Sequence, residues 1–160
     1  MALAVLDPDY PLVVVVHDEA ECQMHNPFEQ ALIEPVLRAL ADKTKYGLDA
    51  VDGLGIVVPH RAQRAALQQS FPELCITDAV QFLLDPRRLT VALSRAKRKM
   101  VLVASRSIFS LFSPDEETFA NSLLWKNLLL RTCTALLWEG ERNGKRVVVW
   151  GGKVEPGRRI

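Results

Sequence analysis

The sequence predicts an α/β fold organised around a mostly parallel sheet. The chain of 160 residues is 49% hydrophobic and 24% charged, which is typical of one globular domain that can bury a core. Short β-branched runs alternate with segments of helical periodicity, and this order favours parallel strands joined by helices. The net charge of +1 creates no general attraction to nucleic acids or membranes, so such a partner would need a local patch.

The first strand and the first helix are the clearest elements of the N-terminal half. The run LVVVV at 12–16 is unbroken and β-branched, as in a strand buried on both faces. The sequence NPFE at 26–29 begins a helix, with asparagine as the N-cap, proline at the first helical position and glutamate at the third. Helical spacing continues to Leu40, although Pro35 should kink or split this helix.

Further strands and helices follow in alternation. A second buried strand, LGIVV at 54–58, leads into a polar helix at 61–70. The other elements expected are a short strand at 74–76, a helix at 87–96, a strand at 100–104, a short helix at 106–112 and a helix from 113 towards 130. The last of these helices begins with the capping box SPDE.

The C-terminal segment predicts a β-hairpin. Two apolar stretches between 136 and 150 are joined by Asn143-Gly144, the strongest short hairpin signal. We therefore divide the chain into a sheet domain at 1–131 and a hairpin appendage with a tail at 132–160. The cross-strand pairs expected for a two-residue turn are Trp138 with Val149 and Leu137 with Trp150.

Composition and motifs argue against several classes of protein. Three scattered cysteines favour neither a disulfide framework nor a zinc site, and we expect no metal ligands in this chain. No apolar run approaches the roughly 20 residues of a membrane span, and the first ten residues lack the pattern of a signal peptide. We therefore expect a cytoplasmic protein with no membrane partner. No glycine-rich loop ends in Gly-Lys-Ser/Thr, so a phosphate cradle of backbone amides is not expected.

The sequence PHRAQ at 59–63 is the first segment whose side chains could bind a ligand. It joins the second strand to its helix, and the carboxyl ends of strands line the ligand crevice in doubly wound sheets. Arg61 and Gln63 could reach an anionic ligand from this edge. The alternative is an exposed helix start with a solvated arginine.

The second such segment is the basic stretch at 87–99, which contains six cations and no acid. At 3.6 residues per turn, Arg88 and Arg95 share a helix face that could bind phosphate. The alternative is a solvated surface helix whose cations lie near its C-terminus, where the helix dipole favours them.

Together the two segments resemble superfamily 1 DNA/RNA helicases. VVPHRAQ at 57–63 is similar to motif IV, and RLTVALSRAK at 88–97 is similar to motif VI, with Thr90 and Ser94 in place of asparagine and threonine. The stretch at 26–29 also resembles the Asn-x-x-Glu helix start that precedes motif IV. The resemblance covers about 12–112 and favours the branch of the nonsense-mediated-decay helicase and the Okazaki-fragment nuclease-helicase.

The resemblance implies a RecA-like sheet domain of the P-loop NTPase type, namely the second motor domain of a helicase. Arg61 would contact the γ-phosphate of ATP, and Arg95 would be the arginine finger, worth roughly 10³ to 10⁵ in rate in phosphoryl transfer generally. Gln63 would help to order the site around Arg61. Arg88 and Lys97 would flank the cleft or touch the nucleic acid backbone. Arg98 and Lys99, from the same basic stretch, are further candidates for contact with nucleic acid.

The sequence also departs from this family. Motif V, with its Gln-Gly-x-Glu block and a further strand, is missing between 77 and 87. ATP with Mg²⁺ would therefore bind only with a phosphate-loop RecA-like domain from another chain or an upstream segment. The missing strand should leave apolar surface exposed or covered by another chain, which makes self-association plausible.

Three functions remain open. The first is the C-terminal motor domain of an ATP-dependent helicase acting on DNA or RNA, which would not hydrolyse ATP alone. The second is a non-catalytic helicase remnant that serves as a protein or nucleic-acid interaction module. The third, a nucleotide-independent nucleic-acid binder, depends only on the basic stretch.

Overall fold

The chain folds into two compact units. The computed structural model describes residues 1–21, 25–40, 54–58, 60–78, 96, 98–109, 123 and 125–153. Unit one comprises 3–20 and 84–160 with Met1, and unit two comprises 21–83 with Ala2. Within the described ranges, no helix is long and apolar enough to cross a membrane.

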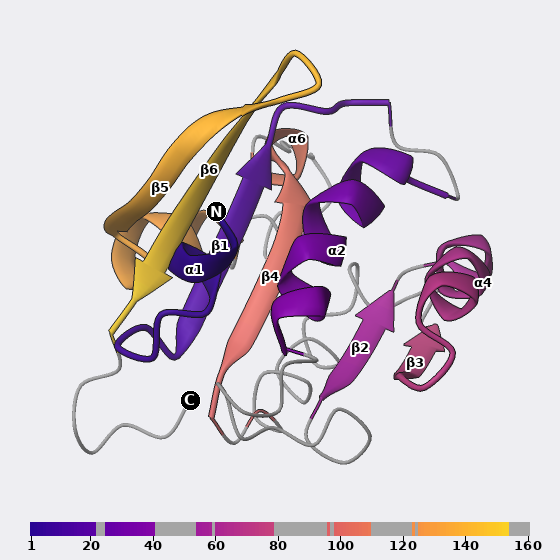
Figure 1. Ribbon diagram of the computed structural model, residues 1–160. Helices are drawn as coiled ribbons and strands as arrows, with labels where there is room; N and C mark the ends of the chain where they lie inside the picture. The colour runs from indigo at the N-terminus through magenta and orange to yellow at the C-terminus, as the bar shows by residue number, and fades with distance from the viewer. Residues whose placement is uncertain are drawn as a thin grey trace. The chain divides into compact units, whose positions relative to one another are not determined.

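Unit one contains a four-stranded sheet of order β4-β1-β6-β5. Its strands are β1 (Leu12–His17), β4 (Met100–Ser105), β5 (Ala135–Arg142) and β6 (Lys145–Gly152). Strand β4 runs parallel to β1, whereas β6 runs antiparallel to β1 and to β5. Figure 1 shows these strands side by side, with the hairpin at one edge. The fold is thus α/β, as the sequence predicts, but this sheet is mixed rather than mostly parallel.

Strand β1 is central because its side chains are apolar on both faces. All six of its residues are buried. On β6, the neighbouring strand, Val147, Val148 and Val149 are also buried. Fully burying one such valine contributes about 1.5–3 kcal/mol relative to exposure. A run of valines therefore needs a strand on each side and cover on each face, and β4 and β6 supply the strands.

The C-terminal hairpin forms at the expected turn. Asn143 and Gly144 have φ angles of 47° and 74°, as a two-residue hairpin turn requires. Trp138 lies opposite Val149, as predicted. Trp150 faces Leu136 instead of Leu137, because a bulge shifts the register between Leu136 and Trp138. The hairpin is also no separate appendage, since β6 pairs with β1 along its length.

Short helices accompany the sheet of unit one. They are α1 (Ala2–Val5), α6 (Arg106–Phe109) and the π-helix η1 (Leu128–Thr132). Helix α6 contacts β4 and η1 contacts β6. The rings of Phe109 and Trp125 meet edge to face, with centroids 5.8 Å apart. The expected short helix after β4 is confirmed over Arg106–Phe109, and the helix expected at 87–96 lies outside the described residues.

Unit two packs two helices with a pair of parallel strands. The strands are β2 (Gly55–Val58) and β3 (Cys75–Asp78), and the helices are α2 (Pro27–Leu40) and α4 (Arg61–Ser70). Helix α2 continues through Pro35, so the expected split does not occur. The core of the unit consists of Leu37, Val58, Leu67, Phe71, Leu74 and Ile76.

Candidate functional site

Arg61 begins helix α4 just beyond the carboxyl end of β2. His60, the N-cap residue, has an extended backbone (φ −130°, ψ 142°) and makes no capping bond with its side chain. Arg61 is exposed. The strand-to-helix junction thus carries an arginine at the edge of a parallel sheet where ligands commonly bind, as the sequence predicts.

Gln63 is buried and holds the backbone of a second helix. Only 3% of this residue is exposed. Its Oε1 accepts a hydrogen bond from the backbone N–H of Asn26 at 2.7 Å, and its Nε2 donates to the carbonyl of Asn26 at 3.5 Å. Gln63 therefore fixes the first turn of α4 against the start of α2. Its amide is thus used inside the protein, where it holds the turn of α4 that begins at Arg61.

Asn26 is the N-cap of α2, as predicted. Its Oδ1 accepts hydrogen bonds from the backbone N–H groups of Phe28 and Glu29, both at 3.1 Å. One residue therefore caps α2 through its side chain and binds Gln63 through its backbone. Losing either contact would disturb the other, since both depend on the same peptide segment.

A second link joins α2 to the far end of α4. The Nε2 atom of Gln30 donates to Ser70 Oγ at 3.2 Å. Gln30 Oε1 lies 3.0 Å from His25 Nε2. Helices α2 and α4 are thus connected at both ends of α4, and the helix that carries Arg61 is fixed at two points.

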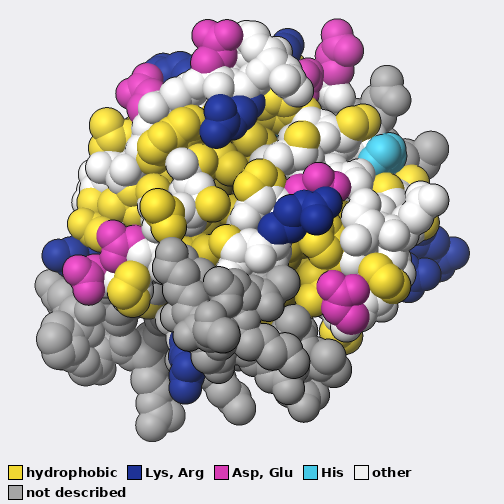
Figure 2. Space-filling view, viewed as in Figure 1, with side chains coloured by type: hydrophobic (Ala, Val, Ile, Leu, Met, Phe, Trp, Pro, Cys, Tyr) yellow, Lys and Arg dark blue, Asp and Glu magenta, His cyan; other side chains and the backbone are white. Residues whose placement is uncertain are grey.

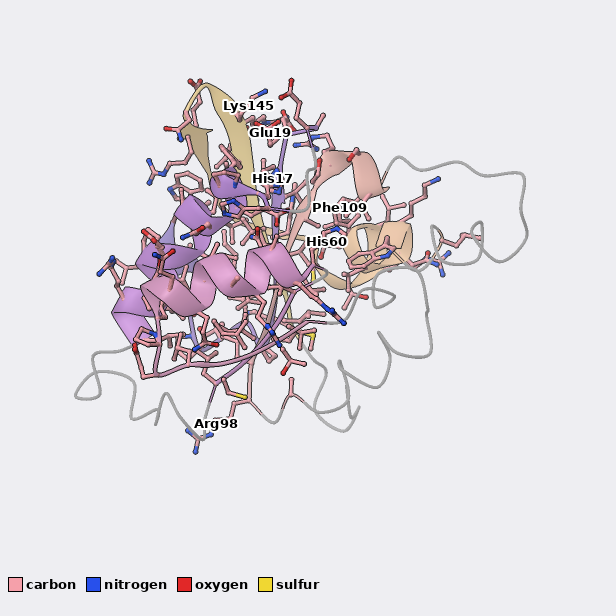
Figure 3. The ribbon with its side chains drawn as sticks, turned by 90° about the vertical axis from the view of Figure 1, so that its right-hand side faces the viewer. His17, Glu19, His60, Arg98, Phe109 and Lys145 are labelled. Atoms are coloured by element: carbon pink, nitrogen blue, oxygen red, sulfur yellow. The ribbon has the colours of Figure 1, made fainter. Side chains whose placement is uncertain are left out.

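The basic stretch is described only at its C-terminal end. Arg88, Arg95 and Lys97 lie outside the described residues, as does the stretch expected to lack motif V beyond Asp78. Arg98 is exposed, and Figure 3 shows it projecting away from the ribbon. It remains a candidate for contact with nucleic acid.

Lys99 has a structural role. Its Nζ donates to the backbone carbonyls of Asp7 and Tyr10, both at 2.6 Å. Burial lowers the pKa of this ammonium group, and the nearby charge of Asp7 partly opposes that effect. A phosphate contact by Lys99 would therefore require it to release the turn that precedes β1.

A polar cluster at the carboxyl ends of β1 and β4 was not expected. Arg106 Nε lies 2.6 Å from Asp18 Oδ1, and Ser105 Oγ donates to the carbonyl of Glu19 at 2.6 Å. Lys145 Nζ approaches Glu19 Oε2 at 3.7 Å, and Figure 3 shows these two side chains together near His17. The partners of these acids lie more than 80 positions away in the sequence, so no local pattern indicates the contacts.

This cluster joins the hairpin tip to the ends of two parallel strands. Its ion pairs are partly exposed, so each contributes at most about 1 kcal/mol to stability. Among the residues that the structure describes, no group of three or more His, Cys, Asp or Glu could hold a metal ion. The cluster therefore connects elements of unit one and provides no described metal centre.

Comparison with known proteins identifies no protein that is similar to this chain. No family model matches the sequence, and no match emerges among curated proteins or solved structures.

Proposed function

We propose that this chain is the C-terminal RecA-like motor domain of a superfamily 1 DNA/RNA helicase. It supplies Arg61 and Arg95 to an ATP site shared with a phosphate-loop domain on another polypeptide segment. The order and spacing of the stretches that resemble motifs IV and VI support this proposal. We assign the protein to the cytoplasm.

The anchored first turn of α4, which begins at Arg61, is the observation that carries the proposal. Arg61 is exposed at the start of α4, while Gln63, two residues on, is buried against the N-cap of α2. A site that stabilises charge in a transition state depends on groups held in place before the reaction. The contact of Gln63 meets that requirement for the backbone from which Arg61 projects.

In this proposal, the phosphate-loop domain and this chain each supply part of the site for ATP hydrolysis. The phosphate-loop domain would hold the β- and γ-phosphates and Mg²⁺. Among the residues that the structure describes, no group of three or more His, Cys, Asp or Glu could hold the metal. Arg61 would bind the γ-phosphate, and Arg95 would stabilise the charge that develops on it. The exposed cations of the basic stretch would contact the nucleic acid.

Steady-state ATP hydrolysis tests this division. We expect no turnover by the purified chain alone, and turnover when the phosphate-loop domain is added. In that complex, Arg95→Ala should lower the rate by roughly 10³ to 10⁵. Equal turnover with wild-type and Arg95→Ala chains would overturn the proposal, as would hydrolysis by the chain alone that Arg95→Ala abolishes.

A non-catalytic helicase remnant is the second candidate. It is favoured by the sequence between 77 and 87, where the Gln-Gly-x-Glu block of motif V is missing. That block couples ATP to nucleic acid in the family that the sequence resembles. A chain that binds nucleic acid or protein but leaves the ATPase rate of every phosphate-loop domain unchanged would support this candidate.

A further inference from the structure

The turn of the hairpin carries an exposed amide side chain next to a glycine. Asn143 and Gly144 form the two-residue loop between β5 and β6, and both are exposed. Their φ angles of 47° and 74° lie in the left-handed region. The flanking residues Arg142 and Lys145 pair with each other and close the ladder, so the peptide bond between Asn143 and Gly144 lies outside it.

Gly144 leaves the space around this peptide bond open. A Cβ atom built on Gly144 would meet no atom within 4 Å. Glycine also presents no side chain to the preceding residue, and its backbone is the least restricted of all residues. A bond between the nitrogen of Gly144 and the Cγ atom of Asn143 closes a five-membered ring. Such an intramolecular attack is favoured because the two atoms are held close together.

We propose that Asn143 deamidates through a succinimide, and that the isoaspartate product releases the hairpin tip from the end of β1. The nitrogen of Gly144 loses its proton and bonds to Cγ of Asn143, and the bond from Cγ to Nδ2 breaks, so that ammonia leaves. Water then opens the imide at either carbonyl carbon. One opening gives aspartate, and the other gives isoaspartate, in which the backbone runs through Cγ. The reaction consumes water, releases ammonia and changes no oxidation state.

The hairpin tip is joined to the end of β1 by the two residues that follow the turn. Lys145 Nζ lies 3.7 Å from Glu19 Oε2, and the backbone N–H of Asp18 donates to the carbonyl of Arg146 at 3.1 Å. Figure 2 shows acidic and basic side chains around the end of the molecule that carries this turn. A change in the path of the turn therefore acts directly on the contacts with β1.

Isoaspartate changes that path, whereas aspartate retains it. The isoaspartate backbone is longer by one methylene group, and the length and geometry of a two-residue turn fix the register of its strands. The extra group therefore shifts Lys145 and Arg146 relative to Glu19 and Asp18. The inference is independent of the proposed function, because it requires neither ATP nor nucleic acid.

Two other asparagines of the chain are internal controls. Asn26 is buried and precedes Pro27, whose nitrogen has no proton to lose. Asn127 precedes Leu128, the first residue of η1, whose side chain crowds the nitrogen that would have to attack. We therefore expect conversion at Asn143 to precede conversion at Asn26 and Asn127.

Peptide mapping by mass spectrometry, after incubation of the folded chain at mildly alkaline pH, tests the reaction. Ring closure requires a deprotonated Gly144 nitrogen, so conversion of Asn143 should accelerate as the pH rises. An isoaspartyl methyltransferase should then label the peptide that contains residue 143. Conversion at Asn127 before Asn143, no conversion of Asn143, or conversion without isoaspartate would overturn the proposal.

Hydrogen exchange at the backbone N–H of Asp18 measures the release of the hairpin tip. This group should lose protection in the incubated wild-type chain relative to the fresh chain. Asn143→Gly is the matched control, because two glycines support the same turn and cannot form the succinimide. Incubated Asn143→Gly should retain its protection. Full protection in a wild-type chain that contains isoaspartate, or the same loss in Asn143→Gly, would overturn the release of the tip.

Discussion

At the scale of single residues, polar side chains that bond inside the protein anchor the backbone next to exposed cations. Gln63 is buried and bonds to the backbone of Asn26, whereas Arg61, in the same turn, is exposed. Lys99 likewise anchors the turn before β1, next to the exposed Arg98. In each case one residue forms hydrogen bonds inside the protein, and the nearby arginine is exposed to solvent.

Replacing Gln63 should destabilise the protein. Gln63→Leu removes the partner of a buried backbone N–H, which costs about 1–3 kcal/mol. Urea unfolding measures this loss. Gln69→Leu, at an exposed position of the same helix, is the matched control and should change stability by about 0.5 kcal/mol or less. Equal effects of the two substitutions would contradict the role given to Gln63.

The free energy of unfolding should depend on pH through the contact of Lys99. Since burial lowers its pKa in the folded state, the unfolded chain holds this proton more tightly. The free energy of unfolding should therefore rise with pH between the lowered pKa and the ordinary value of 10.5. We expect this rise to disappear in Lys99→Met. A variant that retains the full rise would assign it to another group.

The hairpin is the element that departs most from expectation. Its turn forms at Asn143-Gly144, yet β6 continues into the main sheet as the antiparallel neighbour of β1. A bulge before Trp138 changes the register, so that Leu136 faces Trp150. One inserted residue thus decides which side chains share a face with Trp138.

Glycine at the turn is required by the backbone. Gly144 has a φ of 74°, and a Cβ there would meet no atom within 4 Å, so the cost of Gly144→Ala is conformational. We expect a loss of about 1–2 kcal/mol in thermal or urea unfolding. Gly55→Ala is the control, since its Cβ also meets nothing and its φ is not positive. That substitution should be neutral or stabilising by up to about 1 kcal/mol.

Contacts between residues that are close together in the sequence could be predicted from it. Contacts between residues that are far apart in the sequence could not. The cap at Asn26 and the turn at Asn143-Gly144 depend on residues next to one another, so their patterns are visible in the chain. The partner of Gln63 lies 37 positions away, and that of Lys99 about 90. Hydrophobic periodicity shows that a strand is buried, but it does not specify the strand that lies beside it.

At the scale of the whole molecule, the chain is expected to work as part of a larger motor. Six of its 20 lysines and arginines lie in the basic stretch at 87–99, which contains no acid, in a chain of net charge +1. Binding to nucleic acid by the isolated chain should therefore be weak and sensitive to salt.

A titration of single-stranded oligonucleotide at two salt concentrations measures that binding. Each phosphate contact contributes a slope of about −0.7 in log affinity against log salt. Arg98→Glu should weaken binding and make the slope shallower. Affinity that is independent of salt would mean that phosphate contacts are not the source of binding.

The central claim is that this chain donates arginines to an ATP site that it does not itself complete. Its most direct test is the affinity of the chain for the phosphate-loop domain in ADP with aluminium fluoride, which mimics the transferred phosphoryl group, compared with ADP alone. An arginine finger acts in the transition state, so the analogue should tighten the complex by about 100-fold or more. Arg95→Ala should abolish that gain. Equal affinity with and without aluminium fluoride, or the same gain in Arg95→Ala, would contradict the claim.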